Sequence, residues 1–118
     1  NTMSDILTDM HFDPFKWMEV ENKLRERFGR KPDVHSIIYI IGHRELGQNR
    51  TEFTKEEKQD LMHLGVCALL EPAGFYKFSH KDEEGWPHYE KLPGTPRLDG
   101  DMQDILLKTM IIEYFEKL

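Results

Sequence analysis

The sequence predicts a mainly α-helical fold: a single domain of four helices, with one β-hairpin between the third and fourth helices. Helix-start residues precede four segments of the chain, and apolar residues recur at helical spacing within them. Two short aromatic runs flank an acidic turn, which is typical of a hairpin. The expected bounds are helices at about 14–28, 34–46, 55–71 and 100–117, a hairpin at about 75–91, and one domain over 3–118.

The first helix is predicted from its two end signals. Asp13 is suited to cap a helix that starts with Pro14, and Gly29 is suited to end it. Between these signals, apolar residues recur on one face of the helix: Trp17, Val20, Leu24 and Phe28.

The second helix is predicted mainly from the residues at its ends. Asp33 opens the segment and Gly47 closes it, but the run Ile37–Ile41 at its centre has the propensity of a buried strand. An apolar run alone does not decide between a strand and a helix. We expect a helix, because the two end signals stand a helix length apart.

The third helix begins with a capping box formed by Thr54 and Glu57. Its second half, 64–70, is apolar on nearly every face, which is typical of a helix at the centre of a domain. Pro72 and Gly74 are expected to end it.

The hairpin is predicted from the aromatic runs 75–78 and 86–89, with Gly85 in the turn. Pro87 has no N–H to donate, so its strand should lie at an edge or carry a bulge. Side chains alternate between the two faces of a strand, and some of these aromatic residues should therefore be exposed. The predicted partner-binding residues are Tyr76, Trp86, His88 and Tyr89.

The last helix should start at Asp99 or Asp101. Its apolar face is wider than one packing seam requires, so we expect part of it to contact a second copy of the chain. The predicted oligomer contacts are Leu107, Ile111, Tyr114 and Leu118.

Composition and charge narrow the possible functions. The net charge of −6 disfavours a large phosphate-binding surface, so nucleic-acid binding is not expected. A single cysteine cannot form an intramolecular disulfide, and no apolar run approaches the length of a membrane span. We therefore expect a cytoplasmic protein that does not partner a membrane.

One basic cluster stands out, at the end of the first helix. Basic residues in that place complement the partial negative charge of a helix C-terminus, and acidic residues precede them along the helix. We interpret the cluster as structural rather than as a nucleic-acid site. Its members are Arg25, Arg27, Arg30 and Lys31.

Two stretches resemble a small, uncharacterised bacterial protein family of the Bacteroidetes type. They are Phe53-Thr-Lys-Glu-Glu-Lys-Gln-Asp-Leu-Met-His63 and Asp82-Glu-Glu-Gly-Trp-Pro-His-Tyr89. The resemblance covers most of the chain and implies a helical single domain with a hairpin. The family has no assigned activity, so the resemblance implies no catalytic residue.

The order of three helices and a hairpin is also that of a winged-helix DNA-binding regulator. The connection over 47–53, however, is longer than the roughly three or four residues of a helix-turn-helix. The third helix begins with more acidic than basic residues, and the acidic hairpin turn 82–84 would repel phosphate. This function is an alternative.

A metal- or thiol-dependent enzyme is the other alternative. Asp60, His63 and Cys67 are spaced to share a helix face, which suits a metal site or a histidine-activated thiol. Cys67 nevertheless lies in the most apolar part of its helix, where a thiol is usually inert. The sequence thus favours a non-catalytic cytoplasmic interaction module that self-associates, binds another protein, and uses no cofactor or metal.

Overall fold

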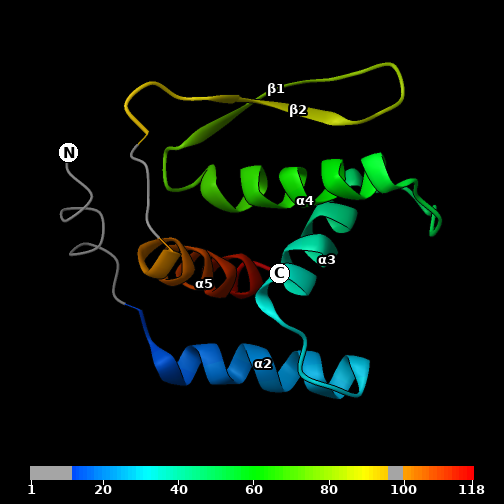
Figure 1. The fold of residues 1–118 in the computed structure, drawn as a ribbon. Helices are drawn as coiled ribbons and strands as arrows, with labels where there is room; N and C mark the ends of the chain where they lie inside the picture. Colours follow the sequence, from blue (N-terminus) through cyan, green and yellow to red (C-terminus); the bar gives the residue numbers. More distant parts are fainter. Residues whose placement is uncertain (1–11, 96–99) are drawn as a thin grey trace. The chain divides into compact units, whose positions relative to one another are not determined.

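The computed structural model describes residues 12–95 and 100–118. It confirms the prediction of four helices with a two-stranded antiparallel hairpin between the third and fourth (Figure 1). The helices and strands of these two ranges are α2 (Pro14–Phe28), α3 (Val34–Leu46), α4 (Lys55–Leu70), β1 (Tyr76–Lys81), β2 (Pro87–Lys91) and α5 (Gly100–Glu116).

These elements form two compact units. One unit spans 33–95 and contains α3, α4 and the hairpin, and the other contains α2 and α5. That the whole of 3–118 is one domain stays a prediction. Residues 3–11 and Asp99, one of the two predicted starts of the last helix, lie outside the described residues.

Helix α2 starts and ends at the predicted signals. The Asp13 carboxylate accepts hydrogen bonds from the backbone N–H groups of Phe15 and Lys16, at 2.9 and 3.2 Å. Gly29 ends the helix in the left-handed conformation, with φ of 78°. The helix buries Trp17, Val20 and Leu24.

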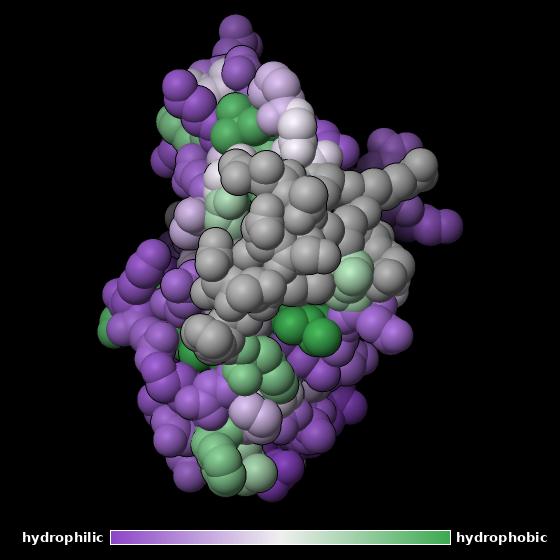
Figure 2. Space-filling view, turned by 90° about the vertical axis from the view of Figure 1, so that its left-hand side faces the viewer, coloured by the Kyte–Doolittle hydropathy of each residue, from purple (hydrophilic) through white to green (hydrophobic). Residues whose placement is uncertain are grey.

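Phe28 follows the spacing of these three residues but differs from them in burial, since 47% of this residue is exposed. Burial along α2 stops at Leu24, and Phe28 is the last residue before the helix ends. Near the other end of α2, Phe15 and Met18 are 77% and 54% exposed. Figure 2 views the side on which α2 begins and shows hydrophobic residues exposed among hydrophilic ones.

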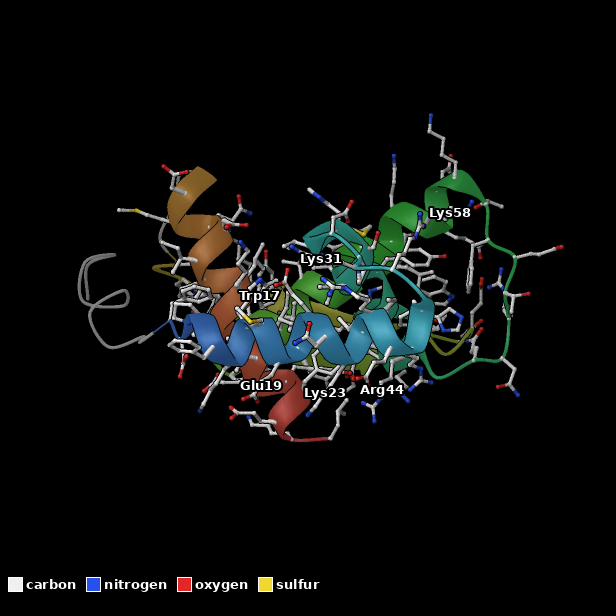
Figure 3. All side chains as sticks on the ribbon, turned by 90° about the horizontal axis from the view of Figure 1, so that it is seen from below. Trp17, Glu19, Lys23, Lys31, Arg44 and Lys58 are labelled. Atoms are coloured by element: carbon white, nitrogen blue, oxygen red, sulfur yellow. The ribbon has the colours of Figure 1, made fainter. Side chains whose placement is uncertain are left out.

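Helix α5 packs against α2 within their unit. Trp17 lies on the side of α2 that faces α5 (Figure 3), with the Lys108 Nζ atom 5.5 Å from its ring centroid. An exposed ion pair joins Lys16 to Glu116 at 3.2 Å. The buried residues of α5 are Leu106, Leu107, Met110, Ile111 and Ile112.

Helix α3 settles the ambiguity at Ile37–Ile41 in favour of a helix. The Asp33 side chain accepts a hydrogen bond from the Ser36 N–H at 2.8 Å, and Gly47 ends the helix with φ of 70°. The end signals were therefore better guides than the strand propensity of the isoleucines.

Helices α3 and α4 approach each other closely at two glycines. A Cβ atom added to Gly42 would overlap the Leu61 carbonyl oxygen, and one added to Gly65 would overlap the Ile38 carbonyl oxygen. Backbone thus packs directly on backbone at this crossing. The predicted capping box at the start of α4 is confirmed.

The hairpin lies along α4 in their unit (Figure 1). Its turn is held by the Asp82 carboxylate, which accepts hydrogen bonds from the Glu84 and Trp86 N–H groups at 2.9 and 3.0 Å. Gly85 has φ of 89°, as the predicted turn requires. A bulge between Phe78 and His80 shifts the strand register.

Candidate functional site

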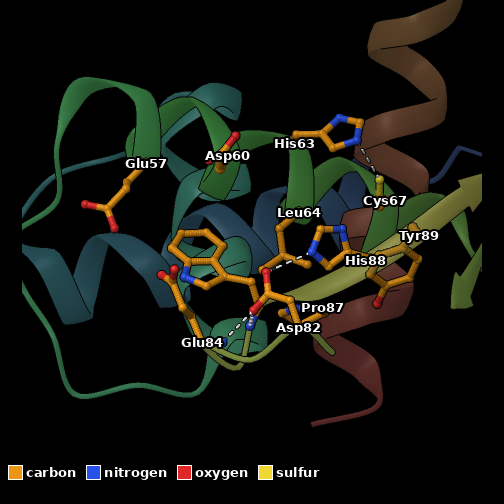
Figure 4. Close-up of a pocket in the computed structure, with 11 residues that line it drawn as sticks. Glu57, Asp60, His63, Leu64, Cys67, Asp82, Glu84, Pro87, His88 and Tyr89 are labelled. Carbon is orange, nitrogen blue, oxygen red and sulfur yellow. Dashed lines mark hydrogen bonds and ion pairs between the residues drawn. The ribbon is translucent and has the colours of Figure 1, made fainter. Parts of the chain in front are cut away.

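A cleft of about 300 Å³ opens between α4 and the hairpin (Figure 4). It lies within one unit, so its geometry follows from local packing of these elements. The turn and β2 supply one wall, and one side of α4 supplies the other. The lining residues are Glu57, Asp60, His63, Leu64, Cys67, Asp82, Glu84, Trp86, Pro87, His88 and Tyr89.

Two predicted groups of residues meet in this cleft. The α4 group is Asp60, His63 and Cys67, and from the hairpin group come Trp86, His88 and Tyr89. The remaining hairpin residue, Tyr76, is not among the lining residues. Its ring is half-buried and lies 6.2 Å, centroid to centroid, from the His63 ring.

The rings of Trp86 and Tyr89 form an aromatic surface of the cleft. They also take part in the packing of the 33–95 unit. Both are half-buried and pack against the buried cluster of Leu46, Leu61 and Leu64. Their substitution would consequently alter stability as well as the cleft. His88, in contrast, is exposed.

His63 and Cys67 are neighbours, with Nε2 and Sγ 3.4 Å apart. Cys67 is 0% exposed, however, and its burial raises the pKa of the thiol to about 11. A buried thiol with that pKa is almost entirely protonated at neutral pH, so the arrangement resembles inert packing more than an activated nucleophile.

The two hairpin histidines face each other across the strands. The rings of His80 and His88 stack with centroids 4.9 Å apart, and His88 Nε2 lies 2.9 Å from Asp82 Oδ2. This contact is the main reason why the pKa of the Asp82 carboxyl lies below its usual value. Across residues 12–95 and 100–118, no three histidine, cysteine or acidic side chains are placed to hold a metal ion.

Four carboxylates line the cleft, two on each wall (Figure 4). Glu57 is already engaged: hydrogen bonds from the Thr54 N–H and then from Arg50 lower the pKa of its carboxyl. Asp82 is engaged by His88. The carboxylates of Asp60 and Glu84 take part in no ion pair among the described residues, and both are exposed.

Sequence reasoning missed Glu57, Asp82 and Glu84 as cleft residues. The signals at these positions, a capping box and an acidic turn, were both interpreted as structural. Their convergence depends on how the hairpin folds back along α4, which neither local signal contains.

The predicted oligomer contacts on α5 differ in how far they are buried. Leu107 and Ile111 are buried within a single chain, Tyr114 is half-buried, and Leu118 is 61% exposed. Leu118 lines a second hollow of about 320 Å³ in the α2–α5 unit. The other lining residues are Val20, Lys23, Leu24, Arg27 and Phe115, and Figure 3 shows Lys23 beside the end of α5.

No protein family, curated protein or solved structure matches this chain. Within the described ranges, no helix is both long enough and apolar enough to cross a membrane.

Proposed function

We propose that this chain is a non-catalytic interaction module that binds a cationic segment of a partner protein in the α4–hairpin cleft. One observation carries the proposal: Asp60 and Glu84, two carboxylates outside any ion pair described, line the same cleft as the half-buried Trp86 ring. An aromatic ring with carboxylates nearby suits a lysine ammonium or an arginine guanidinium.

The alternative of a thiol or metal enzyme is less well supported. The raised pKa of Cys67 and its complete burial disfavour nucleophilic chemistry. The alternative of a winged-helix DNA-binding regulator fits the charges poorly. The face formed by α4 and the hairpin turn carries the four cleft carboxylates, which would repel a phosphate backbone.

We further propose that the module self-associates. Three large apolar side chains of the α2–α5 unit are more than half exposed, namely Phe15, Met18 and Leu118. Exposed apolar residues of this size are common at interfaces between copies of a chain. A cytoplasmic location and membership of the bacterial family named above stay predictions.

The cleft is tested with a fluorescently labelled peptide of lysines spaced by glycine and serine. We expect saturable binding by fluorescence anisotropy, weakening as salt is added, and no binding of the matched peptide with glutamate in place of lysine. Replacing both unpaired carboxylates, Asp60→Asn with Glu84→Gln, should weaken binding by about tenfold or more.

The matched control changes two exposed acidic residues that do not line the cleft, Glu56→Gln with Glu83→Gln. It removes the same formal charge, so it isolates cleft contacts from net charge. Equal affinity of the two double variants would contradict the proposal, because binding would then follow overall charge alone.

A further inference from the structure

The basic end of α2 is a cluster of exposed cationic side chains in the α2–α5 unit. Arg25, Arg27 and Arg30 are all exposed and have no carboxylate within ion-pair distance among the described residues. Lys31 differs, because its Nζ atom lies 3.0 Å from a Glu21 carboxylate oxygen. The exposed Phe28 ring lies beside this cluster, with the Arg27 guanidinium 6.0 Å from its centroid.

The residue types at this end of α2 complement those of the cleft. The helix end offers planar guanidinium groups and one exposed aromatic ring. The cleft offers the carboxylates of Asp60 and Glu84 beside Trp86. Guanidinium groups bind carboxylates through paired hydrogen bonds and stack on aromatic rings, so each surface supplies what the other can bind.

We propose that the occupant of the cleft is the 25–30 segment of a second copy of this chain. This inference rests on the proposed function, because it names the cationic segment that the cleft takes. The charge complementarity of two surfaces of one sequence is its basis, and it places the self-association contact at these charged surfaces rather than at the exposed apolar side chains of the α2–α5 unit.

The contact is heterologous, since the cleft of one copy meets α2 of another. A pair of copies then keeps one free cleft and one free helix end, so assembly either closes into a ring or continues along a chain. The charged groups are exposed, and the assembly should dissociate as salt screens them.

Two charge-reversal variants test the contact in the full-length protein. Asp60→Lys with Glu84→Lys disables the cleft, and Arg25→Glu with Arg30→Glu disables the helix end without changing a residue that lines the α2–α5 hollow. By native mass spectrometry at low ionic strength, we expect oligomers of the unmodified protein and monomers of either variant alone. An equimolar mixture of the two variants should give a dimer and nothing larger, because only one intact cleft and one intact helix end can pair.

The control variant is Lys77→Glu with Lys91→Glu, which reverses two exposed charges of the hairpin strands that do not line the cleft. It should assemble as the unmodified protein does. A mixture that stays monomeric would overturn the inference. Oligomers that survive both charge reversals but are lost in Leu118→Ser would also overturn it, and would place self-association at the α2–α5 hollow instead.

Peptide binding measured on the same samples distinguishes a failure of this inference from a failure of the proposed function. An unmodified protein that is monomeric at low salt but still binds the lysine peptide has a working cleft, and its occupant is then a different protein. A cleft that binds neither the peptide nor a second copy contradicts both proposals.

Discussion

At the scale of single residues, the reactivity of the Cys67 thiol distinguishes an interaction module from a thiol enzyme. Its neighbour His63 is near enough to exchange a proton, but burial raises the pKa of the thiol from 9.0 to about 11. This rise lowers the thiolate fraction about 100-fold at neutral pH, and the thiolate is the reactive species.

We therefore expect native Cys67 to react with Ellman's reagent at least about 100-fold more slowly than the same cysteine in urea, followed by absorbance at pH 8. His63→Ala should leave the native rate unchanged, because the histidine does not activate the thiol. A fast native reaction that slows in His63→Ala would restore the enzyme alternative.

The raised pKa also determines how the contribution of Cys67 to the stability of the fold changes with pH. The folded protein holds the proton more tightly than the unfolded chain does. Its contribution to stability is then complete below pH 9 and is lost as the pH rises through 11. Cys67 thus acts as a small core residue under ordinary conditions.

At the scale of elements, the crossing of α3 and α4 depends on two residues without side chains. We expect Gly42→Ala and Gly65→Ala each to lower the free energy of unfolding by about 1–3 kcal/mol, since the added methyl group meets a backbone carbonyl that has little room to move. Urea denaturation followed by circular dichroism measures the change.

Gly100→Ala is the matched control, because a Cβ atom there meets no atom of the described residues within 4 Å. Gly100 is the first residue of α5, where alanine should be neutral or stabilising by up to about 1 kcal/mol. Equal losses of stability at positions 42, 65 and 100 would indicate that helix crossing is not the cause.

The elements were predictable because their signals are local. The Asp13 and Asp33 caps and the Gly29 turn each act within one helical turn, and they located helices even where Ile37–Ile41 favoured a strand. The glycine crossing was not predictable in this way, since Gly65 meets a residue of another helix. Phe28 shares the spacing of the buried residues of α2 and is nevertheless exposed, because spacing does not show where packing stops.

The candidate site was predictable only in parts. The Asp60, His63 and Cys67 face and the hairpin aromatics were each recognised from spacing, but as separate features. Their meeting in one cleft depends on the hairpin lying along α4, with contacts between residues far apart in sequence. The Glu84 carboxylate lies in the cleft only because the hairpin packs along α4.

At the scale of the whole molecule, one of the two units is a continuous stretch of chain, residues 33–95. It contains α3, α4, the hairpin and every residue that lines the cleft. Stretches of about 60 residues are often long enough to fold alone. Its buried apolar residues are Ile37, Ile38, Ile41, Leu46, Leu61, Leu64, Cys67, Leu69 and Phe75.

We expect a polypeptide of residues 33–95 to fold by itself. Trp86 is its only tryptophan, so a near-ultraviolet circular dichroism band in the indole region reports the hairpin packed on α4. That band should disappear cooperatively on heating, and Gly65→Ala in the same polypeptide should lower the midpoint. A weak band with gradual melting would mean that this core is complete only in the longer chain.

The same polypeptide also distinguishes peptide binding in the cleft from self-association. It keeps the cleft and lacks the competing 25–30 segment, so it should bind the lysine peptide at least as tightly as the full-length chain does. It lacks the 25–30 segment, so it should remain monomeric at low salt and cap the assemblies of the full-length protein when the two are mixed. Growth of full-length oligomers that is unaffected by excess polypeptide would show that the cleft takes no part in assembly, whatever its affinity for the peptide.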